Sequence, residues 1–356
     1  MAADALQELR STIEKQLRRF WSNDAPANPR FGVKNTAPPN ALREEVAEEI
    51  AEMLRKDPTK EGYFGSLSED SRTRMAVSNE EVDSAGSSST VDSLPLGARL
   101  KPRGIFEDDW TARPSPDRPW PIILLHGTAD SKGIWQILGG ELREDGWAVF
   151  APDYGTRATG LLPESAVQVG AYIDAVLTMT GAEKVIIAGH SQGGLLARYW
   201  MRVLGGASKV RHLISIGAPN HGTTEGGIIS PLMASKRNDS IMKSIIQSFF
   251  GDAGQQQIVG SGILSAVNAG GDLDEGVTYT CIATRHDAVV VPPETCFLSP
   301  SKVKDGTVRN IYVQDFDSRA VVLHHDLPVD RRGGALVRTN VRALLAGSPI
   351  GSPKKQ

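Results

Sequence analysis

From about residue 115 onward, short apolar runs alternate with amphipathic stretches, and this alternation constrains the fold more than any other feature of the chain. Apolar runs bounded by polar residues predict buried strands, and apolar residues at helical spacing predict the helices between them. Such an order is typical of an α/β fold, with a mostly parallel central sheet and helices on both faces. We predict strands near residues 121–125, 147–151, 184–188, 211–216, 278–284 and 309–314, and helices near residues 134–145, 164–180, 193–205 and 334–346.

The stretch KVIIAGHSQGGLLARYW, residues 184–200, places Ser191 on the turn between a predicted strand and a predicted helix. A chain that turns this sharply strains the residue at the turn, and only small neighbours leave room for it. Gly189 and Gly193 provide that room. The pattern G-x-S-x-G between a strand and a helix is the nucleophile elbow of serine hydrolases, which exposes the hydroxyl at the positive end of the helix. The alternative is a tight turn with an incidental serine.

A serine hydroxyl is a poor nucleophile near neutral pH, so the elbow requires a base and an acid that orients the base. On this fold the residues follow in the order serine, acid, histidine, each after the C-terminal end of a strand. Asp287 follows the predicted strand at residues 278–284 and is the candidate acid. The adjacent His324 and His325 precede the last predicted helix, and the spacing leaves both open as the base.

The other histidines near these strands are poorer candidates for the base, because they precede or adjoin the acid. We expect them to be surface residues or to stabilise loops: His212, His221 and His286.

The reaction of an activated serine also needs hydrogen-bond donors for the oxyanion of the tetrahedral intermediate. Gly127 follows the first predicted strand and lets the backbone turn, so that the N–H of Thr128 points into the site. The N–H of Gln192, directly after the serine, is the second predicted donor. The alternative for this glycine is an ordinary turn at the end of a strand.

Five segments, in order along the chain, resemble the actinobacterial class 2 lipases of the α/β-hydrolase superfamily. The resemblance covers about residues 118–346 and is carried by HGTADSKGIWQILGGEL, GHSQGG, LGGASKVRHLISIGAPNHGTT, QQQIVGSGILSAVNAG and ATRHDAVVVPP. It implies an α/β-hydrolase fold and hydrolysis of carboxylic esters, such as acylglycerols and other lipid esters, by a triacylglycerol lipase or carboxylesterase. In that family the serine and acid match Ser191 and Asp287, and a histidine before a leucine-proline step favours His324 in HHDLP.

An insertion at about residues 223–275 interrupts the alternation and carries an apolar stripe at helical spacing. We predict that this stripe forms a lid or a wall of an acyl pocket, and a helix buried in the core is the alternative. Its members are Ile241, Ile245, Phe249 and Phe250.

The first third of the chain differs from the rest. We predict an N-terminal helical extension at residues 1–77, a polar serine-rich linker at 78–95 and the hydrolase domain at 96–350. The first amphipathic helix could lie on a membrane surface, bind a partner or pack on its own protein. No secretory signal or transmembrane segment is recognised in the sequence, which favours a cytoplasmic or peripheral location, whereas members of the family that it resembles are commonly exported.

Composition and cofactor requirements narrow the function further. With 39 basic and 42 acidic residues the net charge is −3, so nothing indicates nucleic-acid binding. The chemistry needs no metal or cofactor, and the acidic loop 268–276 matches no ordered calcium loop. Cys281 and Cys296 could form a disulfide or remain separate thiols.

Two other functions remain open at this point. One is thioester or amide hydrolysis, or acyl transfer to an alcohol, on the same site. The other is a non-enzymatic lipid-binding or scaffolding protein, which the ordered presence of all the catalytic elements disfavours.

Overall fold

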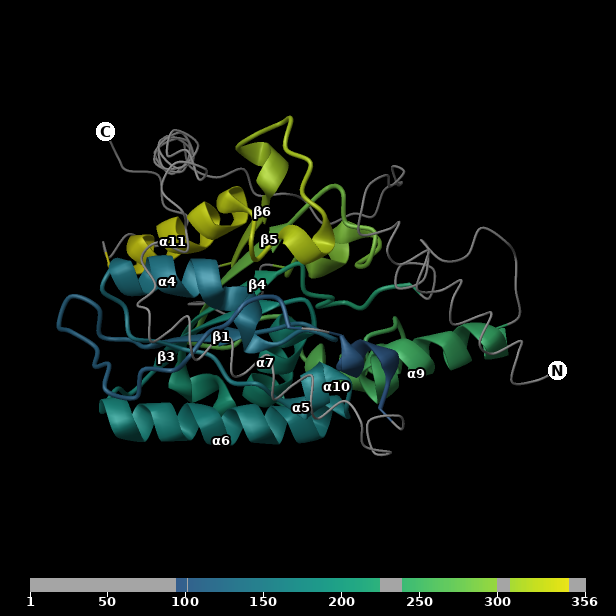
Figure 1. Cartoon of the computed structure of the whole chain (residues 1–356), viewed down its shortest axis with the longest axis horizontal. Helices are drawn as coiled ribbons and strands as arrows, with labels where there is room; N and C mark the ends of the chain where they lie inside the picture. Colours follow the sequence, from purple (N-terminus) through teal and green to yellow (C-terminus); the bar gives the residue numbers. More distant parts are fainter. Residues whose placement is uncertain (1–93, 101, 225–238, 300–307, 346–356) are drawn as a thin grey trace.

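The computed structural model describes residues 94–100, 102–224, 239–299 and 308–345, and within 239–245 it describes the backbone alone (Figure 1). The predicted N-terminal extension and all but the last two residues of the predicted linker lie outside the described residues. None of the helices in the described ranges is both long enough and apolar enough to cross a bilayer.

The described strands form one six-stranded parallel sheet in the order β2-β1-β3-β4-β5-β6. Their bounds are β1 (Ile122–Leu125), β2 (Val149–Phe150), β3 (Val185–His190), β4 (Val210–Ile216), β5 (Thr278–Ala283) and β6 (Val308–Tyr312). The helices are α4 (Gln136–Glu144), α5 (Gly155–Ala158), α6 (Leu162–Thr180), α7 (Gln192–Arg202), α9 (Asp239–Gln256), α10 (Gly262–Val267) and α11 (Arg331–Leu345). The predicted α/β class, with a parallel sheet and helices on both faces, is confirmed.

Each strand lies within two residues of its predicted ends, and the differences at β2 and β3 have reasons seen in the backbone. The edge strand β2 has two residues instead of the five predicted at 147–151, and its pairing with β1 cannot extend further because the next backbone nitrogen that would face β1 belongs to Pro152, which has no N–H. Strand β3 continues past Ala188 to His190, since its last residues stay paired with β4 as far as Ile216.

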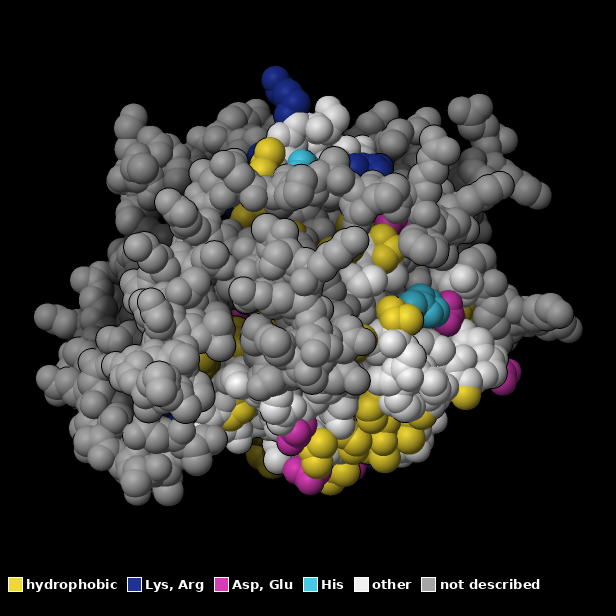
Figure 2. Space-filling view, turned by 90° about the vertical axis from the view of Figure 1, so that its right-hand side faces the viewer, with side chains coloured by type: hydrophobic (Ala, Val, Ile, Leu, Met, Phe, Trp, Pro, Cys, Tyr) yellow, Lys and Arg dark blue, Asp and Glu magenta, His cyan; other side chains and the backbone are white. Residues whose placement is uncertain are grey.

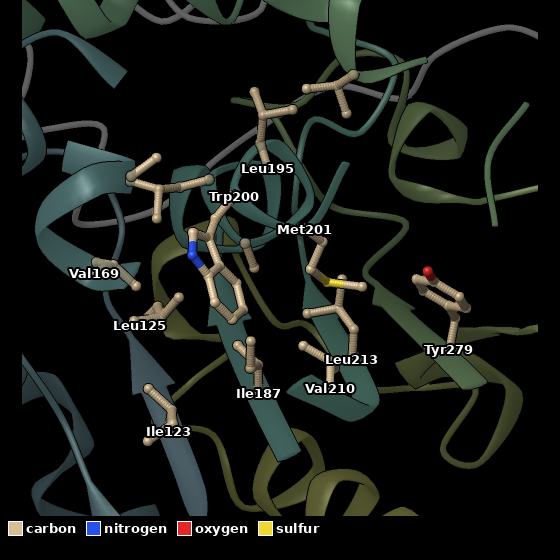
Figure 3. Packing of buried hydrophobic residues seen from close by; sticks show 14 of the residues in the cluster. Ile123, Leu125, Val169, Ile187, Leu195, Trp200, Met201, Val210, Leu213 and Tyr279 are labelled. Carbon is tan, nitrogen blue, oxygen red and sulfur yellow. The ribbon is translucent and has the colours of Figure 1, made fainter. Parts of the chain in front are cut away.

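Alternate side chains of the strands enter two separate cores. Ile122 and Leu124 lie in the core beneath α4 and α11, whereas Ile123 and Leu125 lie in the core beneath α6 and α7. Figure 3 shows the second core, in which Trp200 of α7 lies among the strand residues. Burial of both sheet faces explains why the strands read as unbroken apolar runs. Each predicted helix of this domain is present within three residues of its predicted ends.

The two cysteines are buried and free. Cys281 lies on β5 and Cys296 in the short 3-10 helix η6 (Pro293–Cys296). The amide of Asn220 donates to the Cys296 carbonyl at 2.6 Å. Of the two alternatives for these residues, the described structure has separate thiols.

His212 corrects one expectation of the sequence, because it is neither a surface residue nor a loop residue. Its side chain is fully buried on β4, with Nδ1 2.7 Å from Thr278 Oγ1 and Nε2 3.2 Å from Thr280 Oγ1 on β5. A histidine in a run of apolar residues can satisfy both ring nitrogens from the neighbouring strand, a contact that the local sequence does not reveal.

We predict that His212 makes the protein less stable as the pH falls. Burial, together with the charges of Arg211 and Arg309, lowers the pKa of His212 from its usual 6.5 to about 3. Between these values the unfolded chain binds a proton that the folded chain does not, so the free energy of unfolding decreases with decreasing pH, by up to about 1.4 kcal/mol per pH unit for this group. Urea unfolding of the wild type and His212→Gln between about pH 7 and pH 4.5 measures this slope. Equal slopes for the two proteins would contradict the prediction.

Candidate active site

The C-terminal ends of β1 and β3 form the point at which the chain reverses its direction of winding. The chain passes from β1 to β2 on one side and then returns to β3 on the other side of β1. Ligands of open α/β sheets bind at such switch points, because the two crossovers diverge and leave a crevice there. The loop after β1 and the turn after β3, with Ser191, both lie at this position.

Ser191 occupies the strained turn expected from its neighbours. Its φ of 51° and ψ of −125° lie in a region that residues other than glycine rarely adopt. A Cβ on Gly193 would clash with the backbone carbonyl of Leu125, and a Cβ on Gly189 would clash with the backbone of Gly193. The two glycines therefore let the start of α7 approach β1 and β3 closely enough for this turn to form. The N–H of Ser191 donates to the Ile216 carbonyl at 2.8 Å, which ties the turn to β4.

The structure brings Ser191, His324 and Asp287 together from three separate strand ends. His324 Nε2 lies 2.9 Å from Ser191 Oγ, and His324 Nδ1 lies 2.8 Å from Asp287 Oδ2. The other carboxylate oxygen of Asp287 accepts the N–H groups of Val289 and Val290 at 2.9 and 2.8 Å. The carboxylate is thus held with one oxygen directed at the imidazole. All three of these side chains are largely buried.

A residue that the sequence analysis did not single out, His190, holds the backbone of His324. The Nε2 of His190 lies 3.0 Å from the His324 carbonyl, and the two rings are 5.0 Å apart. Burial, and to a lesser extent the nearby His324, lowers the pKa of His190 well below its usual range. His190 is therefore neutral, its Nε2–H donates to the His324 carbonyl, and it adds no charge beside the imidazole. The position of His190 directly before Ser191 in GHSQG is the one feature of the sequence that could have indicated this role.

His325, the alternative base, lies beside this chain of contacts rather than within it. Its Nε2 is 3.2 Å from the Asp326 carboxylate. Burial, with the charges of Arg103 and His324, lowers the pKa of His325 to about 3. Neighbouring residues on the short 3-10 helix η8 (His324–Asp326) point in different directions, so only one ring reaches Ser191 Oγ.

The loop after β1 lies against the serine, as its position in the sheet requires. A Cβ on Gly127 would be 3.0 Å from the Cβ of Ser191, so the glycine permits close contact between the loop and the turn. Thr128 follows it and accepts a hydrogen bond on Oγ1 from Gln257 Nε2 at 3.1 Å. Gln192 is the first residue of α7, where a helix leaves its N–H groups without intrahelical partners. These two backbone N–H groups are the candidate oxyanion donors.

Helix α9 approaches the site from the insertion. Phe249 is buried and Phe250 is partly buried, with their rings 4.6 Å apart. The side chains of the other two predicted stripe residues, Ile241 and Ile245, lie outside the described ones. The contact between Gln257, directly after α9, and Thr128 was missed by the sequence analysis. The run of three glutamines in QQQIVG gives no indication of which one faces the site.

The acidic loop at 268–276 is used for internal ion pairs. Asp272 lies 3.7 Å from the buried guanidinium of Arg198 and 3.2 Å from His221 Nε2, and Asp274 lies 3.1 Å from Arg202. In the parts of the chain that the structure describes, no three His, Cys, Asp or Glu side chains are grouped to hold a metal ion.

A comparison with protein families agrees with this architecture. A family model described as the alpha/beta hydrolase fold matches residues 121–250, from β1 into α9. The chain has the α/β-hydrolase fold.

Several known proteins resemble part of this chain. The chain is 32% identical over 111 residues to a triacylglycerol lipase of Pseudarthrobacter phenanthrenivorans and, likewise over 111 residues, to one of Burkholderia plantarii. Each match covers 29% of this chain, and the two cover 34% and 30% of the respective lipases. The chain is 33% identical over 86 residues to a 2-succinyl-6-hydroxy-2,4-cyclohexadiene-1-carboxylate synthase of Serratia proteamaculans, which is 23% of this chain and 32% of that protein. The chain thus spans about a third of the length of the curated relatives that it matches.

We predict that Gly193→Ala destabilises the α/β-hydrolase domain by about 1–3 kcal/mol, because the added methyl group must push the start of α7 away from β1. Gly140→Ala on α4 is the matched control, since a Cβ there meets nothing within 4 Å. That helical substitution should stabilise the protein by about 0.5–1 kcal/mol. Midpoints of urea unfolding compare the variants, and a Gly193→Ala midpoint equal to that of the wild type would contradict the role given to this glycine.

Proposed function

We propose that this protein is a serine hydrolase that cleaves carboxylic esters through a Ser191-His324-Asp287 triad and an acyl-enzyme intermediate. The observation that carries the proposal is the continuous pair of contacts, 2.8 and 2.9 Å long, from Asp287 through His324 to Ser191 Oγ. The match to two triacylglycerol lipases gives further support. Such an arrangement activates an alcohol that is otherwise a poor nucleophile.

The first half of the reaction acylates the serine. His324 Nε2 takes the proton of Ser191 Oγ as the oxygen attacks the ester carbonyl, and the carboxylate of Asp287 stabilises the imidazolium that forms. The N–H groups of Thr128 and Gln192 donate to the oxyanion of the tetrahedral intermediate. His324 then gives the proton to the departing alcohol, and the acyl group stays on Ser191.

The second half uses the same groups in reverse. Water enters in place of the alcohol, and His324 accepts its proton as it attacks the acyl carbonyl. The tetrahedral intermediate again places its oxyanion at the two backbone donors, and its collapse releases the carboxylic acid and restores Ser191. Every proton in this cycle moves through His324 Nε2, so the reaction requires no metal or organic cofactor.

We further propose acylglycerols or other lipid esters as the substrates, as in the class 2 lipases that the chain resembles. Helix α9 carries the apolar side chains of Phe249 and Phe250, and Gln257, directly after it, contacts Thr128 of the oxyanion loop. Figure 2 shows hydrophobic side chains gathered on the end of the molecule where α9 lies. Leu161 and Val259, near the C-terminal end of α9, are 38% and 57% exposed. We propose that these apolar side chains form a wall of the acyl site, which would favour a lipid-like acyl chain and contact with a lipid surface.

Hydrolysis of a nitrophenyl ester series, from short to long acyl chains, tests the triad. Ser191→Ala should lower kcat about a thousandfold or more, and Asp287→Asn about ten-thousandfold, because the amide holds the imidazole in the wrong tautomer. Ser208→Ala is the matched control, since Ser208 precedes β4 at the opposite edge of the sheet. Wild-type rates for Ser191→Ala would contradict the proposal. Activity on thioesters or amides, but on no ester, would assign the same site to another acyl transfer.

The substrate proposal has its own test in α9. Replacing Phe249 and Phe250 by serine should lower kcat/KM for long-chain esters more than for short-chain esters, because each lost apolar contact affects only an acyl chain long enough to reach it. Melting temperatures of the variants measure any loss of folded protein, which would lower both activities alike. An equal loss on long and short esters would contradict the acyl-wall proposal and favour a helix that serves only the core.

A further inference from the structure

The segment that joins β2 to α6 contains an unusual turn. Four consecutive residues have positive φ, namely 58° at Gly155, 50° at Thr156, 60° at Arg157 and 54° at Ala158, and only the first is a glycine. The Ala158 N–H donates to the Tyr154 carbonyl at 2.9 Å, and the Thr159 N–H donates to the Gly155 carbonyl at 2.9 Å. This element, α5 in Figure 1, is therefore one turn of left-handed helix.

A left-handed turn is unfavourable for residues that carry a Cβ, because the Cβ comes too close to the following carbonyl oxygen. Such a conformation persists only where contacts with the surrounding structure hold it, and such places are concentrated at functional sites. Hydrogen bonds connect this turn with the loop after β1, which carries the candidate oxyanion donor Thr128.

Arg157 makes the central contacts with that loop. Its backbone carbonyl accepts the N–H of Ala129 at 2.8 Å, and its Nη2 donates to the carbonyl of Ala129 at 3.0 Å. Ala129 directly follows Thr128 and also has a positive φ, of 65°. One residue of the turn thus binds both backbone groups of the residue that follows the candidate donor.

The residues on either side of Arg157 extend the contact. The Tyr154 hydroxyl donates to the carbonyl of His126. The side-chain amide of Gln192 donates to the Ala158 carbonyl at 3.0 Å. The turn, together with Tyr154 directly before it, therefore binds the loop before and after Thr128, and the turn also binds the residue that carries the second candidate donor.

We propose that the left-handed turn at residues 155–158 holds the oxyanion loop in its catalytic conformation, and that Arg157 is the positioning residue of this turn. The inference rests on the proposed function of the site. A backbone N–H stabilises an oxyanion only when its direction is set before the reaction. With the carbonyl of His126 and both backbone groups of Ala129 bound, the N–H of Thr128 between them cannot rotate freely away from the serine.

The side chain of Arg157 is suited to this task because its planar guanidinium is always charged and directs its N–H groups in fixed directions. A side chain without the guanidinium leaves the Ala129 carbonyl without this donor, although the backbone contact from the Ala129 N–H can remain. Loss of the side chain should therefore loosen the loop without unfolding the domain.

Two substitutions of Arg157 separate its positioning role from its effect on stability. Arg157→Ala and Arg157→Gly both remove the guanidinium, but glycine also removes the steric cost of the left-handed conformation. Arg157→Gly should therefore melt at a higher temperature than Arg157→Ala. If the guanidinium positions the loop, both variants lose about tenfold to a hundredfold in kcat despite their different stabilities, with KM nearly unchanged. Arg157→Lys, which keeps a cationic donor, should recover part of the rate.

Labelling by an alkyl fluorophosphonate gives a second readout that does not depend on any ester substrate. In this reaction Ser191 Oγ forms a bond to phosphorus, fluoride leaves and the hydroxyl proton passes to His324. The phosphonyl oxygen gains negative charge in the transition state, so the labelling rate also depends on the oxyanion donors. We expect Arg157→Ala and Arg157→Gly to label more slowly than the wild type, by factors similar to their losses in kcat. Arg113→Ala is the control, because Arg113 also donates to backbone carbonyls, of Trp110 and Ala112, but on an exposed segment.

The outcomes separate this inference from the proposed function. If the Arg157 variants label as fast as the wild type, or if only the less stable of them is slow, the inference is overturned and the triad stands. If the wild type labels but hydrolyses no ester, ester hydrolysis fails as the function, and the labelling rates of the variants still decide the role of Arg157. If the wild type does not label at Ser191, both proposals are overturned.

Discussion

The arrangement of the site depends on the close approach of the first turn of α7 to strands β1 and β3. This approach places Ser191 in a backbone conformation that it would not adopt by itself, with its side chain at the C-terminal edge of the sheet. It is possible because Gly193 presents no side chain to the Leu125 carbonyl. The strain at one residue is offset by burial of α7 against the sheet and by the hydrogen bond from the Ser191 N–H to β4.

The parallel sheet then supplies the partners of the serine. Because all its strands run in one direction, the segments that follow β1, β3 and β5 emerge at the same edge, and Asp287 comes to lie near Ser191 although almost a hundred residues separate them. His324 arrives after β6 and bridges the two side chains. The site is thus a consequence of topology, and the local chain conformations only adjust the final distances.

Support for the site comes from residues that contact its backbone. His190 holds the carbonyl of His324, and the turn at residues 155–158 holds the loop that carries Thr128. Neither contact involves a side chain of the proposed triad. His190 adjoins Ser191 in sequence, and the turn follows β2, the strand next to β1 in the sheet. A site built in this way has its geometry set before substrate arrives, which is the condition for stabilising developing charge without reorganisation.

Much of the fold could be predicted because the signals are local. Buried strands read as apolar runs, helices read as periodic stripes, and each predicted element of the domain that lies in the described residues is present there. The errors have separate causes. His212 looks like a surface residue because its partners, Thr278 and Thr280, belong to a strand more than sixty residues away. Strand β2 ends before its apolar run does because Pro152 has no N–H to extend the pairing with β1.

The sequence by itself determined the α/β class, the position of Ser191 on a tight turn and the order of the candidate acid and base, because periodicity and the need for glycine are properties of neighbouring residues. Only the tertiary structure decided which of two adjacent histidines reaches Ser191 Oγ, since that depends on where separate strand ends meet in space. It also decided that residues 155–158 form a left-handed turn. Three of those four residues disfavour that conformation intrinsically, and contacts with the loop after β1 and with α7, distant in sequence, help to hold it.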